Sequence, residues 1–141
     1  MSDFYTYFKE NMDGLGLPAP ENLFGTLQAA VGSASVVLGM VDKFGKRVTI
    51  GELLGAGTRL EGLAAVSACA AAFYVGAVVG SIAVATGRSM ASGASLSDVS
   101  NTVTKYHFSR PWLTEVLRRW PGIYKPEFAS RDTYYRCAAI A

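Results

Sequence analysis

The chain has 141 residues, 50% of them hydrophobic and 17% charged, and its formal net charge is +2. This length corresponds to one domain, and the composition is too hydrophobic for a disordered protein and low in charge for a typical soluble domain. The small net charge excludes a global field of the kind that attracts nucleic acid, so we expect no nucleic-acid partner.

Residues 1–21 form an N-terminal arm. The arm begins with acidic and aromatic residues rather than with a basic and then an apolar stretch, so we expect no secretory signal peptide. Pro18 and Pro20 disfavour a helix near its end. Two interpretations stay open. The arm packs on the surface of the domain, which we favour, or its aromatic side chains anchor it at a membrane boundary.

The first uncharged run covers residues 22–41, about the length of one bilayer crossing. Its glycines recur at every seventh position, and small-residue stripes let two helices approach closely in lipid. They are Gly25, Gly32 and Gly39. In a pore, the polar residues of this run would face the lumen, namely Thr26, Gln28, Ser33 and Ser35. The run also fits an amphipathic helix of an ordinary bundle.

Residues 42–61 connect the first run to the second. A basic cluster follows the first run, formed by Lys43, Lys46 and Arg47. Thr49 and Glu52 have the spacing of a capping box, in which each side chain bonds a free backbone amide at the start of a helix. This pair predicts a short helix near residues 50–56.

The second uncharged run covers residues 62–87, between Glu61 and Arg88. As one helix it would be about 39 Å long, more than a bilayer core requires. Small residues recur at every fourth position and predict a glycine-zipper face. They are Ala64, Ala68, Ala72, Gly76 and Gly80. The run therefore predicts a membrane-capable helix, and the alternative is a central helix buried in a bundle.

Residues 88–141 are expected to form a basic, aromatic C-terminal segment with helical parts. Ser95 and Asp98 have the spacing of a second helix cap. Residues 109–120 have the period of an amphipathic helix, which Pro121 and Gly122 end. This helix either packs on the domain or lies on a membrane surface, and the sequence favours neither. On a membrane, the residues at the interface would be Trp112, Arg118, Arg119 and Trp120.

The sequence contains no recognisable catalytic motif. No cluster of histidine, cysteine or acidic residues has the spacing of a metal site, and neither Cys69 nor Cys137 belongs to a CxxC motif. We expect Cys69 to be a small buried hydrophobic residue. We therefore expect no enzyme, no metal and no cofactor.

These features predict an all-α single domain over residues 1–141. It would be a small helical bundle or hairpin built around two Gly/Ala-rich helices, at about residues 22–41 and 62–87, and able to insert into a membrane. The arm at residues 1–21 precedes this glycine-zipper unit of residues 22–87, and the basic segment of residues 88–141 follows it.

The chain resembles the glycine-zipper pore-forming effectors of bacterial type VI secretion, of the pseudomonad type. The resemblance is carried by the three glycines of the first run, by RVTIGELLGAGTRLEGL at residues 47–63, by GAVVG at residues 76–80 and by RPWLTEVLRRWPGIY at residues 110–124. The resemblance extends over most of the chain, from Gly25 to Tyr124.

The resemblance implies an antibacterial toxin that is cytoplasmic before export, leaves without a signal peptide and acts in the inner membrane of a rival bacterium. It implies small ion-conducting pores that dissipate the membrane potential. The implied partners are membrane lipids, further copies of the chain, a hexameric ring protein of the secretion tube as carrier, and a cognate immunity protein in the inner membrane. No catalytic residue is carried over.

Two other classes of protein remain open. One is a resident membrane protein with a helical hairpin, such as a holin-like protein or an assembly subunit. The other is a soluble all-helical interaction module with residues 62–87 in its core. A toxin that travels through water must cover its apolar runs. We therefore expect either a carrier or a folded form in which residues 62–87 are a central helix wrapped by the others.

Overall fold

The computed structural model of the protein describes residues 3–45, 47–55, 69–87, 95–125 and 131. Within these ranges the regular elements are helices, and the pairing of extended backbone is limited to one antiparallel bridge between Thr49 and Ala70. The predicted all-α class is confirmed. The elements are α1 (Asp3–Gly14), α2 (Glu21–Phe24), α3 (Leu27–Phe44), α4 (Ile50–Gly55), α5 (Ala71–Gly87), α6 (Leu96–Lys105), α7 (Pro111–Arg119) and the 3₁₀ turn η2 (Pro121–Ile123).

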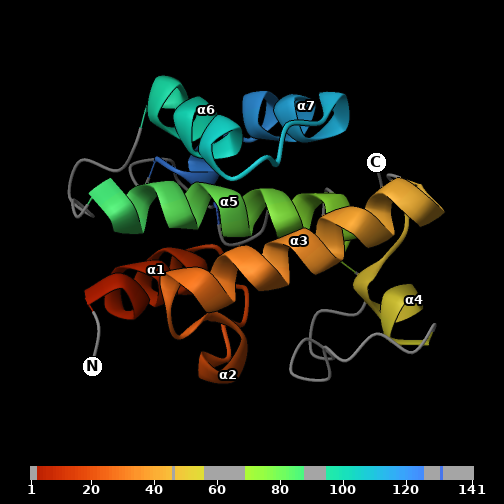
Figure 1. The fold of residues 1–141 in the computed structure, drawn as a ribbon, viewed down its shortest axis with the longest axis horizontal. Coiled ribbons are helices and arrows are strands. Elements are labelled where there is room, and N and C mark those ends of the chain that lie inside the picture. Colours follow the sequence, from red (N-terminus) through yellow and green to blue (C-terminus); the bar gives the residue numbers. More distant parts are fainter. Residues whose placement is uncertain (1–2, 46, 56–68, 88–94, 126–130, 132–141) are drawn as a thin grey trace.

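Helix α5 is the centre of the bundle. It lies between α6 and α7 on one side and α1 and α3 on the other (Figure 1), and it contacts all four of these helices and η2. Every residue from Ala71 to Ala85 is buried. The expectation of a central apolar helix wrapped by the other helices is therefore confirmed for residues 71–85, and Thr86 and Gly87 at its end are exposed.

The prediction of a continuous helix over residues 62–87 is wrong at Cys69 and Ala70. The amide of Ile50 donates to the Cys69 carbonyl at 2.9 Å, and the amide of Ala71 donates to the Val48 carbonyl at 2.8 Å. In a continuing helix these groups would instead bond residues four positions away along the same helix. Because Cys69 and Ala71 pair with residues around the start of α4, the central helix begins only at Ala71. The zipper positions Ala64 and Ala68 lie outside the described residues.

The prediction of one helix over residues 22–41 also requires correction. Gly25 and Thr26 separate α2 from α3, because Thr26 is extended and its side-chain oxygen accepts a hydrogen bond from the Ala29 amide at 3.1 Å. This is an N-cap, so a new helix begins there. At its other end α3 continues to Phe44, beyond the uncharged run, and ends at Gly45, whose φ is +102°.

The N-terminal arm packs on the bundle, as the favoured interpretation predicted. Phe8 and Met12 are buried on α1, and the Phe8 ring stacks on that of Phe24 at 5.2 Å between centroids. After α1, the chain passes the central helix closely, because the Tyr74 hydroxyl donates to the Pro18 carbonyl at 2.8 Å. Aromatic residues of the arm are therefore core residues in this fold.

The helix caps predicted at Thr49 and at Ser95 are both present, and the pair Thr58 and Glu61, which has the same spacing, lies outside the described residues. Thr49 and Glu52 bond each other's backbone amides at the start of α4, and Ser95 and Asp98 do the same at the start of α6. Among the helices that the structure describes, none combines the length and hydrophobicity that a membrane span requires. Insertion into a membrane stays a prediction.

We predict that Leu113→Ala in α7 lowers the free energy of unfolding by about 2–5 kcal/mol, because it removes a buried side chain and leaves a cavity. Leu113 is 0% exposed and Leu96, at the start of α6, is 44% exposed. Leu96→Ala is therefore the matched control, with an expected change of less than about 0.5 kcal/mol. Urea denaturation followed by circular dichroism measures both, and equal losses would contradict this packing of α7.

Candidate functional site

Gly76 and Gly80 form a bare face on α5 that α7 and η2 cover. A Cβ atom added at Gly76 would lie 2.7 Å from Cγ1 of Val116, and one added at Gly80 would overlap Cγ2 of Ile123. Real Cβ atoms do not approach neighbours so closely. The absence of side chains at these two positions therefore lets the C-terminal elements pack against the backbone of the central helix. Ala72, on the same row, is also buried.

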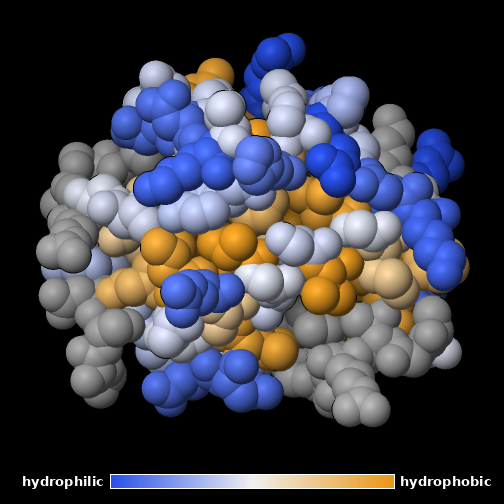
Figure 2. All heavy atoms as spheres, in the orientation of Figure 1, coloured by the Kyte–Doolittle hydropathy of each residue, from blue (hydrophilic) through white to orange (hydrophobic). Residues whose placement is uncertain are grey.

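The glycines of the first run have a different environment. Gly32 and Gly39 are exposed on α3, and a Cβ atom added at either would meet no atom within 4 Å. Gly25 lies at the C-terminal end of α2, so the three glycines do not share one helix face as predicted. Apolar side chains gather across the middle of the face shown in Figure 2. On α3, Val36 is 50% exposed.

The four predicted lumen residues have separate roles in this fold. Thr26 caps α3, and the Ser33 hydroxyl donates to the Leu23 carbonyl at 2.7 Å. Ser35 is exposed and its hydroxyl donates to the Val31 carbonyl one turn earlier at 2.9 Å. Gln28 is exposed. A lumen-facing role would therefore belong to another state of the protein, and it stays a prediction.

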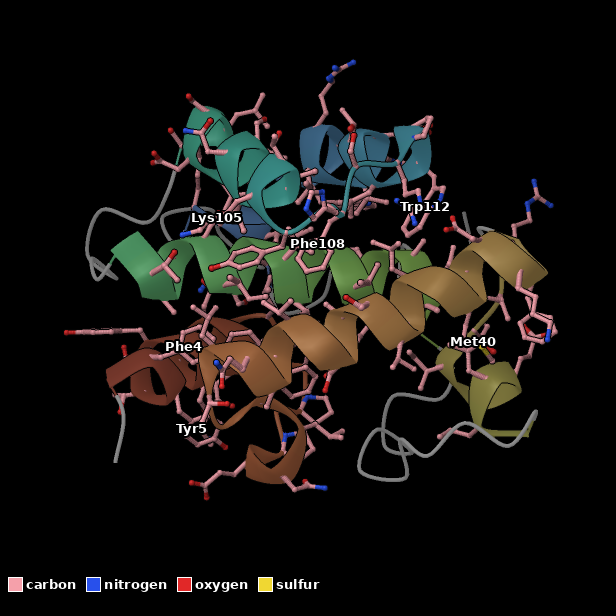
Figure 3. The ribbon with its side chains drawn as sticks, in the orientation of Figure 1. Phe4, Tyr5, Met40, Lys105, Phe108 and Trp112 are labelled. Atoms are coloured by element: carbon pink, nitrogen blue, oxygen red, sulfur yellow. The ribbon has the colours of Figure 1, made fainter. Side chains whose placement is uncertain are left out.

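The predicted interface residues of α7 are partly occupied by contacts within the bundle. The Trp120 ring meets the edge of Phe73 with 5.9 Å between centroids, and the Arg119 guanidinium lies 5.3 Å from the centre of the Trp120 ring. Trp112 points from α7 toward the end of α3 (Figure 3). Arg118 is exposed. Helix α7 is a packed amphipathic helix here, and its contact with a membrane stays a prediction.

One carboxylate joins α3 to α7 at the surface. Asp42 accepts hydrogen bonds from Nε of Arg110 at 2.7 Å and from the indole of Trp112 at 3.2 Å. Arg110, and to a smaller extent Trp112, hold the pKa of Asp42 below its usual range. The side chains of Arg110 and Asp42 are about a third exposed, so water screens the pair and its contribution to stability is small.

A buried polar cluster joins the N-terminal helix to the other end of the chain. The Asn11 amide donates to the Ser81 hydroxyl and to the Ile123 carbonyl, both at 2.8 Å. Arg131 donates to Oδ1 of Asn11 at 3.1 Å and to the Gly122 carbonyl at 2.7 Å. Sequence reasoning missed this cluster. Two features of the sequence could have indicated it: Asn11 is a polar residue on the apolar side of α1, and Ser81 is a polar residue within an uncharged run.

Cys69 is fully buried, as expected from the sequence. Burial raises the pKa of its thiol to about 12, so the thiol stays protonated and is a poor nucleophile. Within the described part of the chain, no three histidine, cysteine or acidic side chains gather in a way that could hold a metal ion. Cys137 lies outside the described residues.

Comparison of the chain with protein-family models, with curated proteins and with solved structures finds no match. The resemblance to type VI effectors therefore rests on the sequence motifs that carry it.

We predict opposite effects for alanine at the two kinds of glycine. Gly39→Ala should raise the free energy of unfolding by about 0.5–1 kcal/mol, because an exposed helical glycine costs conformational entropy. Gly80→Ala should lower it by about 1–2 kcal/mol, because overpacking against Ile123 outweighs that gain. Thermal and urea denaturation measure both variants. A stabilised Gly80→Ala protein would show that η2 does not pack tightly on α5.

We predict that Arg110→Gln raises the pKa of Asp42 more than Trp112→Phe does, because the guanidinium is its stronger partner. Since the folded-state pKa is lowered, the contribution of Asp42 to stability is present above its unfolded-state pKa. It is lost as the pH falls through the folded-state pKa. Carboxyl-detected NMR titration of the three proteins measures the order, and identical titration curves would contradict it.

Proposed function

We propose that this protein is a pore-forming antibacterial effector of type VI secretion, which stores a membrane-inserting helix inside a bundle and releases it at the inner membrane of the target cell. The observation that supports the proposal is the environment of α5, which has no charged residue and is buried on all sides from Ala71 to Ala85. A helix that is apolar all round suits a bundle core, and it suits lipid equally well.

The proposal requires α5 to lengthen in lipid. Its 17 residues correspond to about 26 Å of helix, whereas a bilayer core is about 30 Å thick. The sequence is free of charge back to Gly62, so a helix that grew in this direction would reach the necessary length. Growth would require the backbone bridge between Thr49 and Ala70 to open.

Helix α3 is the second element of the proposed membrane form. Glycine costs a helix about 1 kcal/mol relative to alanine, and nothing in the described fold packs on Gly32 or Gly39 to explain that cost. In the proposed pore this bare face contacts further copies of the chain. Two helices cannot enclose a water-filled path, so the pore is an oligomer. Its lumen is lined by the polar residues Thr26, Gln28, Ser33 and Ser35.

The remaining parts of the proposal follow from the sequence resemblance. The protein is cytoplasmic before export, travels with a hexameric ring protein as its carrier, and is neutralised in the producer by a membrane immunity protein. The reaction at the membrane is ion flow down a gradient, so no cofactor and no catalytic residue takes part.

One observation favours a second candidate, a soluble helical interaction module. The contacts of Gly76 with Val116 and of Gly80 with Ile123 explain both glycines without any membrane. Such a module would be inert toward lipid. A resident hairpin membrane protein differs from both, since it would be found in the membrane of its own cell at rest.

The test is ion flux across liposomes exposed to the purified full-length protein, with a potential-sensitive dye and a large entrapped dye. We predict that the potential is lost while the large dye is retained, because an oligomer of thin hairpins makes a narrow pore. Absence of flux at every protein-to-lipid ratio, with the protein left in the aqueous fraction, would exclude the effector and leave the interaction module.

The exposed glycines of α3 allow a test of whether helix pairing in lipid is needed for ion flux. Gly32→Leu and Gly39→Leu place bulk into open space, so the folded bundle should persist while helix pairing in lipid, and with it the flux, decreases. Thr104→Leu on the exposed face of α6 adds similar bulk away from the zipper and should leave the flux unchanged. Gly76 and Gly80 are unsuited to this comparison because side chains there alter the bundle itself.

A further inference from the structure

Resting on the proposed function, we infer that α7 and η2 form an autoinhibitory clamp. They occupy the Gly76–Gly80 face of α5 and must leave it before α5 can pair with a second helix in lipid. The two glycines lie about one helical turn apart, so their bare face has room for one closely packed partner. In this fold that partner is supplied by Val116 and Ile123 of the same chain.

The clamp is held at both of its ends. Before α7, Arg110 pairs with Asp42 on α3. After α7, the carbonyl of Ile123 accepts from Asn11 on α1, and Arg131 donates to the neighbouring Gly122 carbonyl. Between these ends, Leu113 and Leu117 are buried. The C-terminal elements are thus attached to α1, α3 and α5, and they leave the glycine face only if these attachments break.

The close approach of Val116 and Ile123 to the two glycines allows the clamp to be tested by disulfide cross-linking. A Cβ atom at residue 76 would lie 3.7 Å from Cβ of Val116, and one at residue 80 would lie 3.7 Å from Cβ of Ile123. Both separations fall within the range of disulfides, about 3.5–4.5 Å. Replacement by cysteine also removes the crowding methyl groups of Val116 and Ile123. Each pair can therefore be joined by a disulfide that locks the clamp closed.

The experiment uses the full-length chain with Cys69→Ala and Cys137→Ser as background. One variant adds Gly76→Cys with Val116→Cys, and a second adds Gly80→Cys with Ile123→Cys. Oxidised glutathione accepts the two electrons and two protons that the paired thiols lose, and mass spectrometry verifies the bond. Circular dichroism verifies that each oxidised protein is folded. The single-cysteine proteins Val116→Cys and Ile123→Cys, treated in the same way, are the controls.

Flux across liposomes should fall, in each oxidised double variant, to the level of liposomes without protein, and dithiothreitol should restore it. The Val116→Cys and Ile123→Cys controls, which keep both glycines, should conduct in both conditions. If a folded, fully cross-linked protein conducts as well as its reduced form, the clamp is wrong while the proposed function stands. If the background protein, which keeps both glycines, produces no flux, the proposed function fails and the clamp fails with it.

Discussion

Burial of α5 on every side is the constraint on which the rest of the structure depends. An amphipathic helix needs a core on one side, but α5 has no side that tolerates water, so other elements must surround it. Each large apolar side chain removed from water contributes about 1.5–3 kcal/mol. Helices α1, α3, α6 and α7 supply the cover, and each is buried mainly on the face that meets the central helix.

Two buried hydroxyls interrupt the apolar surface of α5, and both determine where the N-terminal arm lies. A buried hydroxyl without a partner is costly, so Tyr74 and Ser81 require hydrogen bonds. Tyr74 donates to the Pro18 carbonyl, and Ser81 accepts from Asn11 on α1. Asn11 in turn bonds Ile123 and Arg131, so a single polar cluster sets the positions of the arm, the central helix and the C-terminal elements.

Local signals in the sequence predicted the features that depend on neighbouring residues. The capping boxes at Thr49 and Ser95 are correct because each involves residues three positions apart. The predicted start of the central helix was wrong because Cys69 and Ala70 pair with residues near α4. The hydrophobicity of the sequence does not reveal this pairing. The glycine spacing was visible, but its partners on α7 and η2 were not. The cluster around Asn11 was missed for the same reason, since its partners lie 70 to 120 residues away.

The forces that hold α5 in the bundle differ between water and lipid. In water, burial of apolar surface supplies most of the stabilising free energy. In a bilayer this driving force disappears, because lipid tails are as apolar as the side chains they would replace. The contacts that then still oppose release are polar or geometric. They are the bonds of Asn11 and Arg131, the Asp42–Arg110 pair, the Tyr74–Pro18 hydrogen bond and the close packing on Gly76 and Gly80. Since most of these contacts hold the C-terminal elements, the release that we propose for the central helix would meet its barrier in α7 and η2 rather than in the hydrophobic core.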